Sequence, residues 1–199
     1  MARAALGRPS ERRCFGEGTG RSERLGWVGS SRVVAKTGQL GVQGTMRQAL
    51  LIIDVQPSFS PPDWLVRDLR ALAPTLPSIS TVERHDEAMT PFQRQLDWKP
   101  GASDNGLVPT DKVFIKHGYL PPVELIAYLR TLEVARVLVC GIQADTCVLA
   151  AGFMLFEAGL NPTLLPWLTI GSSLDRTGEL GARLWQHHFG AALSGPDEI

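Results

Sequence analysis

From Ala49 onward, short apolar runs alternate with segments that have the periodicity of amphipathic helices, and this alternation limits the folds open to the chain. The runs "ALLIIDV" (49–55), "KVFIKH" (112–117) and "ARVLVCG" (135–141) are nearly continuous in apolar residues. Such runs are typical of parallel strands that are covered on both faces. Weaker strand candidates are residues 78–84, 162–167 and 189–193.

Four helical patterns lie between these runs. Residues 61–72 and 121–132 each begin with a pair of prolines and place apolar side chains along one stripe. Residues 145–159 run from an N-cap-type aspartate to a terminating glycine, and residues 173–188 supply a final helix. Strands that alternate with helices predict an α/β fold of three layers, in which right-handed βαβ units build a parallel sheet between helices.

The first 45 residues differ from the rest in composition and charge. They carry eight Lys and Arg against three Glu, whereas the remainder carries twelve against seventeen acidic residues. Because the segment is rich in Gly, Ser and Arg and lacks a sustained period, residues 1–45 are expected to form a basic, disordered extension. Residues 46–199 are then one domain, although Met46 could equally be the natural start. The acidic balance of the domain argues against nucleic-acid binding.

In a parallel sheet of this kind, the ligand crevice lies beyond the carboxyl ends of the strands. Asp54 and Lys116 lie near the ends of two apolar runs, and Cys147 lies in the first turn of the helix after residues 135–141. Each residue type also has a purely structural explanation, as a turn former, a solvated cation or a packed small side chain. For Cys147, a helix N-terminus predicts a lowered thiol pKa and a reactive thiolate. Cys140, inside the run, is expected to be packed.

The segments "LLIIDVQPSF", "VFIKHGY" and "VCGIQADTCV" together resemble the isochorismatase-like cysteine hydrolases. This superfamily contains nicotinamidases, N-carbamoylsarcosine amidohydrolase and ureidoacrylate amidohydrolase. The resemblance extends from about Met46 to the end of the chain. It implies a Rossmann-like, six-stranded parallel sheet of order 3-2-1-4-5-6.

The resemblance also implies a site and a reaction. Asp54, Lys116 and Cys147 would form a catalytic triad that hydrolyses a small amide, ureido or carbamoyl compound through a thioester. Asp54 would take the thiol proton and Lys116 would stabilise the charged pair. A cis peptide bond between Ile142 and Gln143 would precede an oxyanion hole made of the backbone N–H groups of Gln143 and Cys147.

Two features of the expected pocket need comment: the metal ligands of the superfamily and the residues of the lining. Nicotinamidases of the superfamily carry an Asp-x-His and a further His that bind a metal, but the matching residues 83–98 offer only His85. No metal and no cofactor are therefore expected. Aromatic residues are the candidates for the pocket lining, and they would look the same as core residues. These candidates are Phe59, Trp98, His117, Tyr119 and Trp167.

Two other functions are alternatives to the enzyme. A catalytically inert domain that binds or scaffolds a partner would keep the triad without turnover. A nucleotide-binding domain would need a glycine-rich loop after the first strand, and the segment there, "DVQPSFSPP", has no glycine.

Because residues 145–159 are apolar on more than one stripe, homo-oligomerisation is expected. Three unpaired cysteines and the absence of a long apolar run predict a cytoplasmic protein without membrane spans.

Overall fold

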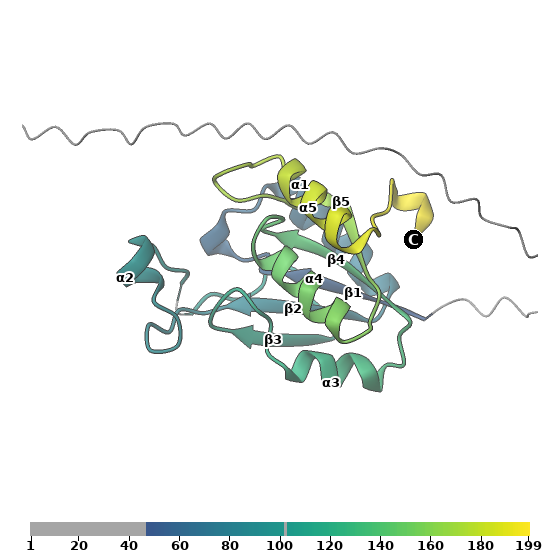
Figure 1. Ribbon diagram of the computed structural model, residues 1–199, viewed down its shortest axis with the longest axis horizontal. Helices are drawn as coiled ribbons and strands as arrows, with labels where there is room; N and C mark the ends of the chain where they lie inside the picture. Colours follow the sequence, from purple (N-terminus) through teal and green to yellow (C-terminus); the bar gives the residue numbers. More distant parts are fainter. Residues whose placement is uncertain (1–46, 102) are drawn as a thin grey trace, which may run out of the picture. The chain divides into compact units, whose positions relative to one another are not determined.

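A parallel sheet of five strands forms the centre of the structure, a computed structural model that describes residues 47–101 and 103–199 (Figure 1). The expected extension, residues 1–45, lies outside the described residues. Within them the strand order is β3-β2-β1-β4-β5, and every neighbouring pair is parallel. The strands are β1 (Gln48–Ile53), β2 (Ser78–Glu83), β3 (Lys112–Lys116), β4 (Arg136–Ile142) and β5 (Pro162–Ile170).

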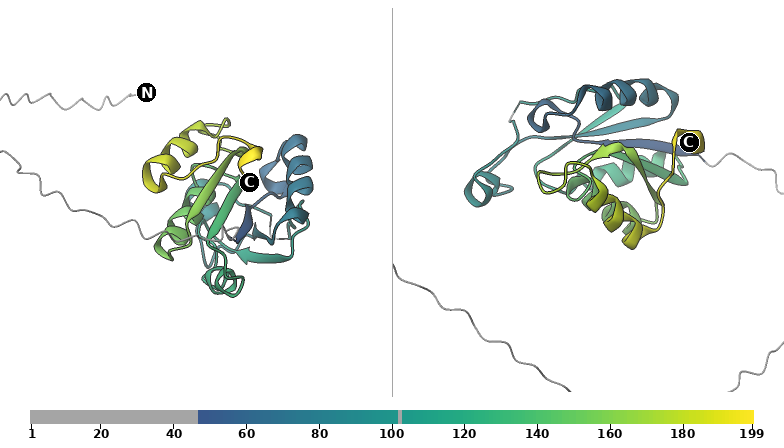
Figure 2. Two further views of the ribbon diagram at one scale, coloured as in Figure 1. Left: turned by 90° about the vertical axis from the view of Figure 1, so that its right-hand side faces the viewer. Right: turned by 90° about the horizontal axis from the view of Figure 1, so that it is seen from above.

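Helices cover both faces of this sheet, so the predicted three-layer α/β class is confirmed (Figure 2). Helix α1 (Asp63–Leu72) packs on one face, whereas α3 (Glu124–Thr131), α4 (Cys147–Glu157) and α5 (Glu179–Phe189) pack on the other. The short helix α2 (Phe92–Leu96) was not predicted, and it lies in a long connection that extends beyond the sheet (Figure 1). Three single turns of 3-10 helix, η1 (Pro57–Phe59), η2 (Ala73–Thr75) and η3 (Pro196–Glu198), complete the described elements.

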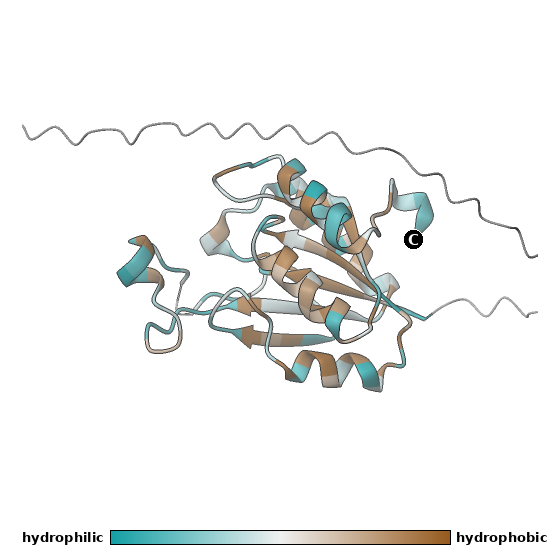
Figure 3. Cartoon of the chain, viewed as in Figure 1, coloured by the Kyte–Doolittle hydropathy of each residue, from teal (hydrophilic) through white to brown (hydrophobic). Residues whose placement is uncertain are grey.

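The central strand β1 explains why the sequence reads as an unbroken apolar run. Leu50 and Ile52 face the layer that contains α1, while Leu51 and Ile53 face α3, α4 and α5, and all four are fully buried. Each side chain of this size contributes about 1.5–3 kcal/mol when it is buried completely. Colouring by hydropathy shows that α4 and β4 are also largely apolar, which is consistent with their place in the core (Figure 3).

The predicted sixth strand, residues 189–193, is wrong. Helix α5 extends to Phe189 and ends at Gly190, whose φ of 71° lies in the left-handed region. Only Ala192 then forms an isolated bridge, with Leu164 of β5. Because the end of the helix occupies the first residues of the apolar segment, too few remain to form a strand, and the sheet has five strands rather than six.

The predicted final helix begins later than its sequence pattern suggests. Residues 173–178 form a loop instead, and α5 starts at Glu179. The Asp175 side chain accepts hydrogen bonds from the backbone N–H of Thr177 at 3.1 Å and of Leu180 at 2.7 Å. An aspartate that accepts hydrogen bonds from the free N–H groups of a first helical turn stabilises the start of the helix there. The helix therefore begins after Asp175 and not at residue 173.

The carboxyl ends of β1 and β4 approach each other closely. Gly141 has a φ of 112°, and a Cβ atom at this position would overlap the backbone N and O atoms of Ile53. Only glycine fits such a position without strain. Directly after β1, Asp54 also has a positive φ, of 50°. This backbone conformation directs the chain, and with it Asp54, away from the regular course of the strand.

Candidate active site

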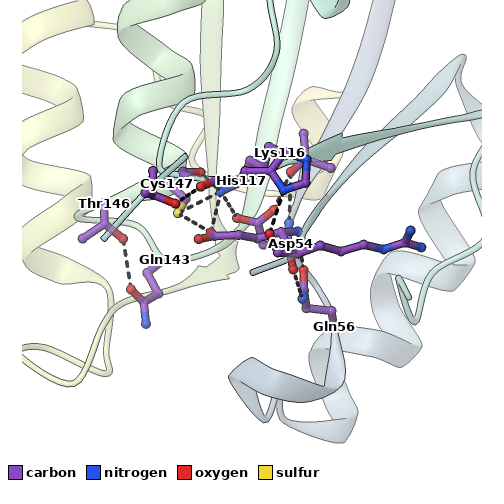
Figure 4. A network of polar contacts seen from close by, with 12 residues as sticks. Asp54, Gln56, Lys116, His117, Gln143, Thr146 and Cys147 are labelled. Carbon is purple, nitrogen blue, oxygen red and sulfur yellow. Dashed lines mark hydrogen bonds and ion pairs between the residues drawn. The ribbon is translucent and has the colours of Figure 1, made fainter. Parts of the chain in front are cut away.

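The predicted residues Asp54, Lys116 and Cys147 come together at the carboxyl edge of the sheet (Figure 4). Asp54 follows β1, Lys116 is the last residue of β3, and Cys147 is the first residue of α4. Their exposed fractions are 0%, 2% and 4%. Ionisable groups this deeply buried are rare unless they are paired, so their contacts with one another define the site.

The ammonium group of Lys116 is the centre of the cluster. Its Nζ atom lies 2.8 Å from Asp54 Oδ2 and donates a hydrogen bond to Cys147 Sγ at 3.3 Å. It also donates to the backbone carbonyl oxygen of Gly118 at 2.6 Å. A cation in direct contact with a sulfur atom stabilises the thiolate form of that sulfur relative to the thiol.

Glu83 is a fourth member of the cluster, and it was not predicted. It is the last residue of β2 and only 1% exposed. Its Oε2 atom lies 2.6 Å from Lys116 Nζ and accepts a hydrogen bond from the Cys147 thiol at 3.6 Å. Because β2 lies between β1 and β3, its end had to reach the same edge as Asp54 and Lys116, and the strand-end argument could have found Glu83.

Neighbouring polar groups hold the two carboxylates in place. Thr81 Oγ1 donates a hydrogen bond to Asp54 Oδ1 at 2.7 Å. The side-chain amide of Gln56 bonds both backbone groups of Glu83, donating to its carbonyl oxygen and accepting from its N–H, each at 2.7 Å. Gln56 and Thr81 therefore tie the end of β1 to the end of β2, and they fix the positions from which both acids reach Lys116.

The Cys147 thiol does not have the lowered pKa that its helix position predicts. Burial, followed by the negative charge of Asp54, raises the pKa of Cys147 well above its ordinary value, and the attraction of Lys116 opposes this only in part. The expectation was wrong because it considered the helix terminus alone and could not include burial or two nearby carboxylates. A raised pKa favours the protonated thiol, and reaction of a protonated thiol requires a base.

The two other charged groups respond to the same surroundings. Burial alone would lower the pKa of Lys116, but the negative charge of Asp54, followed by those of Cys147 and Glu83, raises it overall. Burial, helped by the charge of Asp54, raises the pKa of Glu83, although Lys116 acts in the opposite direction. Lys116 is thus a cation at neutral pH, and Glu83 binds a proton more readily than an ordinary glutamate does.

The turn between β4 and α4 presents backbone groups to the site. The peptide bond between Ile142 and Gln143 is cis, as the resemblance implied. In the part of the chain that the structure describes, no hydrogen bond connects the N–H groups of Gln143 and Cys147 to another residue. Thr146 Oγ1 donates to the Gln143 side chain at 3.0 Å (Figure 4). Gln143 and Cys147 both line the cavity, so their two N–H groups are candidates for binding an oxyanion.

A cavity of about 440 Å³ leads to Cys147 and Glu83. Three of the predicted aromatic residues, Phe59, Trp98 and Tyr119, line it, together with Phe92 of α2. The Phe92 ring centroid lies 6.2 Å from that of Trp98 and 5.3 Å from that of Tyr119, both in edge-to-face geometry. This volume suits a small molecule, and the aromatic wall suits a flat one.

Two of the predicted lining residues do not reach this cavity. The His117 side chain is instead placed with its Nδ1 atom 2.9 Å from the carbonyl oxygen of Arg84, and it lines a separate hollow beside Met89 and Leu120. Trp167 lines another hollow, between α1 and the carboxyl-terminal residues. Successive side chains of a strand point to opposite faces. His117 follows Lys116 directly, so its side chain points away from the face that Lys116 occupies.

Another part of the cavity lining is polar, which the sequence did not indicate. Ser172, Ser173 and Arg176 contribute to it from the loop after β5. Asp145 holds this loop, because its carboxylate accepts hydrogen bonds from the Ser172 N–H at 2.8 Å and the Ser172 Oγ at 2.6 Å. Among the described residues that line the cavity, Arg176 is the only basic one.

The described residues do not fit a metal beside the cavity. Asp54, Glu83 and Cys147 are the one group of three candidate ligands found in residues 47–101 and 103–199. However, Lys116 Nζ contacts all three of them, and its charge would repel a metal cation placed there. His85 lies apart from this group, with Nε2 3.4 Å from Glu87 Oε2.

No protein-family model and no curated protein sequence matches the chain. Solved structures do match its fold, and the three described below are 16–20% identical to it. N-carbamoylsarcosine amidase from Thermoplasma acidophilum aligns with a TM-score of 0.62 and 20% identity, over 77% of this chain and 99% of that chain. Pyrazinamidase of Pyrococcus horikoshii, in complex with zinc, aligns with a TM-score of 0.63 and 19% identity, over 75% and 99%.

An isochorismatase-like hydrolase from Alkaliphilus metalliredigens has a TM-score of 0.60 and 16% identity, over 73% of this chain and 93% of that chain. These similarities show that the chain has the isochorismatase-like hydrolase fold, as its sequence motifs implied. Within the described ranges, the structure contains no helix whose length and hydropathy would let it span a bilayer.

Proposed function

We propose that this chain, which has the fold of the isochorismatase-like hydrolases, is a cysteine-dependent hydrolase of a small amide, ureido or carbamoyl compound. The observation that carries the proposal is the contact of Cys147 Sγ with Lys116 Nζ, at 3.3 Å, at a cavity of small-molecule size. A purely structural cysteine does not need a buried lysine beside it. The names of the structurally similar amidases support the same chemistry.

The reaction would proceed through a covalent intermediate. The Cys147 thiol gives up its proton to a neighbouring carboxylate, and the thiolate, stabilised by Lys116, attacks the amide carbon. The N–H groups of Gln143 and Cys147 bind the oxyanion that develops on the carbonyl oxygen. The C–N bond then breaks as the leaving nitrogen takes up a proton, and water hydrolyses the thioester to release the acid and the free thiol.

A screen for ammonia release tests this function. The panel should contain aromatic amides, ureas and N-carbamoyl compounds, each as a neutral molecule and as its carboxylate-bearing partner, because Arg176 lines the cavity. We expect turnover of at least one compound by the purified protein. If none is hydrolysed and Cys147 also resists iodoacetamide, the chain is an inert member of the fold that binds or scaffolds a partner.

Turnover is expected to be independent of metal. Lys116 already neutralises the acidic cluster, so an added cation has no role there. Prolonged incubation with EDTA, followed by gel filtration into metal-free buffer, should leave kcat/KM within about twofold of its starting value. Recovery of lost activity on addition of zinc, iron or manganese would contradict this expectation.

We further propose that the protein self-associates through α4. Phe153 and Phe156 on this helix are 39% and 55% exposed, and both rings pack against Phe189 of α5. A contiguous apolar surface of this kind commonly marks an interface. Sedimentation velocity at micromolar concentration should show a dimer or larger species that Phe156→Asp converts to a monomer; a wild-type monomer would contradict the proposal.

We also propose a cytoplasmic location. Cys140 and Cys147 are both free and buried, and free thiols persist in reducing compartments.

A further inference from the structure

We infer that Glu83, rather than Asp54, exchanges the proton of the Cys147 thiol, and that Asp54 is a positioning residue for Lys116. This inference rests on the proposed function, but it concerns a residue that the sequence motifs do not include. It changes the catalytic unit from a triad into four residues in which the two carboxylates have different roles.

The contacts of the two carboxylates distinguish them. Cys147 Sγ donates a hydrogen bond to Glu83 Oε2 at 3.6 Å, whereas no such bond joins it to Asp54 in the described part of the chain. Both carboxylates form an ion pair with Lys116, through Asp54 Oδ2 at 2.8 Å and Glu83 Oε2 at 2.6 Å, so the contact with the thiol is what distinguishes them. Among the described residues, Glu83 Oε1 and Asp54 Oδ2 are both buried without a hydrogen-bond partner, so each acid has an oxygen that could hold a proton, but only Glu83 is bonded to the thiol.

Access to the substrate favours the same assignment. Glu83 lines the cavity beside Cys147, whereas Asp54 is not among the lining residues and is fully buried behind Lys116. A group that takes a proton from the nucleophile and later delivers it to the leaving nitrogen must be within reach of both. Of the two acids, Glu83 alone both bonds the thiol and lines the cavity.

The surrounding charges make this transfer favourable. Glu83 faces Asp54, Lys116, Cys147 and the phenol of Tyr119. After the thiol proton moves to Glu83, the Glu83 carboxyl group is neutral. Asp54 and the Cys147 thiolate are then the two anions, and Lys116 is the one cation. The ammonium then contacts both remaining anions, Asp54 and the thiolate. Burial and Asp54 already favour the neutral form of Glu83, which supports this order of charges.

The proton balance then runs through a single carboxyl group. In acylation the S–H bond breaks and an O–H bond forms on Glu83, while the S–C bond forms and the carbonyl electron pair moves to oxygen. The oxyanion collapses, the C–N bond breaks, and the Glu83 proton goes to the leaving nitrogen. In deacylation Glu83 takes a proton from water, whose oxygen attacks the thioester, and returns that proton to the sulfur atom.

The pH dependence of Cys147 alkylation tests the inference without any substrate. The rate of carbamidomethylation at Cys147 is followed by peptide mass spectrometry from acidic to alkaline pH. In the wild type, the alkylation rate should rise twice as the pH increases. The first rise occurs when Glu83 loses its proton and can accept that of the thiol, and the second occurs when the thiol ionises directly to solvent. Glu83→Gln should lose the first rise, with a rate between the two rises at least tenfold below that of the wild type.

Asp54→Asn is the matched control, since it makes the same chemical change at the other carboxylate that contacts Lys116. It should keep the two-step profile. Glu83→Asp, which retains a titrating group, should also keep the first rise and provides the test if Glu83→Gln does not fold. A first rise that disappears in Asp54→Asn and survives in Glu83→Gln overturns the inference, as does a single alkaline rise in the wild type. An absence of amidase turnover would leave these profiles measurable, so the two proposals can fail separately.

Discussion

Replacement of Cys147 by alanine is expected to reduce amide hydrolysis by about three orders of magnitude or more. Within residues 47–101 and 103–199, the substitution removes the only sulfur atom that bonds Lys116 and Glu83, so no covalent intermediate can form there. The change is small in volume, and Cys147 is buried in the core next to Val148 and Ala151, so the fold should persist. The measurement is kcat/KM on the best compound of the panel, together with the melting temperature of the variant.

Cys140→Ala is the matched control for this loss. Cys140 is also a buried, free cysteine, but its Sγ lies 3.8 Å from the carbonyl oxygen of Leu51 inside the sheet, and burial raises its pKa. This variant should keep at least half of the wild-type kcat/KM. A Cys147→Ala protein that retained a tenth of the activity would rule out covalent catalysis by this residue.

Replacement of Lys116 by methionine should damage both activity and stability. The variant leaves Asp54 and Glu83 buried without their shared cation, and removal of one partner from a buried ion pair costs about 3–5 kcal/mol. Turnover should fall by about a thousandfold, because the thiolate also loses its stabilising contact. Lys112→Met is the control, since Lys112 is an exposed lysine of the same strand.

The stability defect of Lys116→Met should depend on pH. Burial and Asp54 raise the folded-state pKa of Glu83, and the lysine that opposes this rise is absent in the variant. A group whose pKa is raised on folding contributes stability that is present below its unfolded pKa, about 4.3 for Glu, and is lost as the pH rises through the folded pKa. Urea unfolding should therefore show the smallest difference from wild type near pH 4 and a larger one at pH 7. A difference that is constant over this range would contradict the account.

The sequence predicted the layers of the fold well, because burial on both faces leaves a direct mark on composition. Strand β1 is buried on both sides, and its run of apolar residues identified it without ambiguity. The edges were less predictable. Residues 189–193 have the apolar character of a strand, but the end of α5 at Gly190 depends on the tertiary course of the chain. Helix α2 is too short to show a period.

The site was predicted only where a residue type is unusual in its position. A lysine at a strand end and a cysteine at a helix start drew attention, and both lie in the cluster. Glu83 was not predicted because residues 78–84 have only a weak strand pattern, so the sequence does not mark Glu83 as a strand end. Ser172 and Arg176, which line the cavity, lie in or next to a segment with a helical pattern. The segment forms a loop because of hydrogen bonds to Asp145 and Asp175, which the pattern does not reveal.

The most direct test of the account is the detection of the acyl-enzyme itself. The protein is mixed with a hydrolysed compound from the panel, quenched in acid within the first turnovers, digested and examined by mass spectrometry. The account predicts an acyl adduct on the peptide that contains Cys147, on its thiol, which disappears in Cys147→Ala and persists in Cys140→Ala. Hydrolysis that proceeds with no adduct on Cys147 under conditions that slow deacylation, or with an adduct on Cys140 instead, would contradict it.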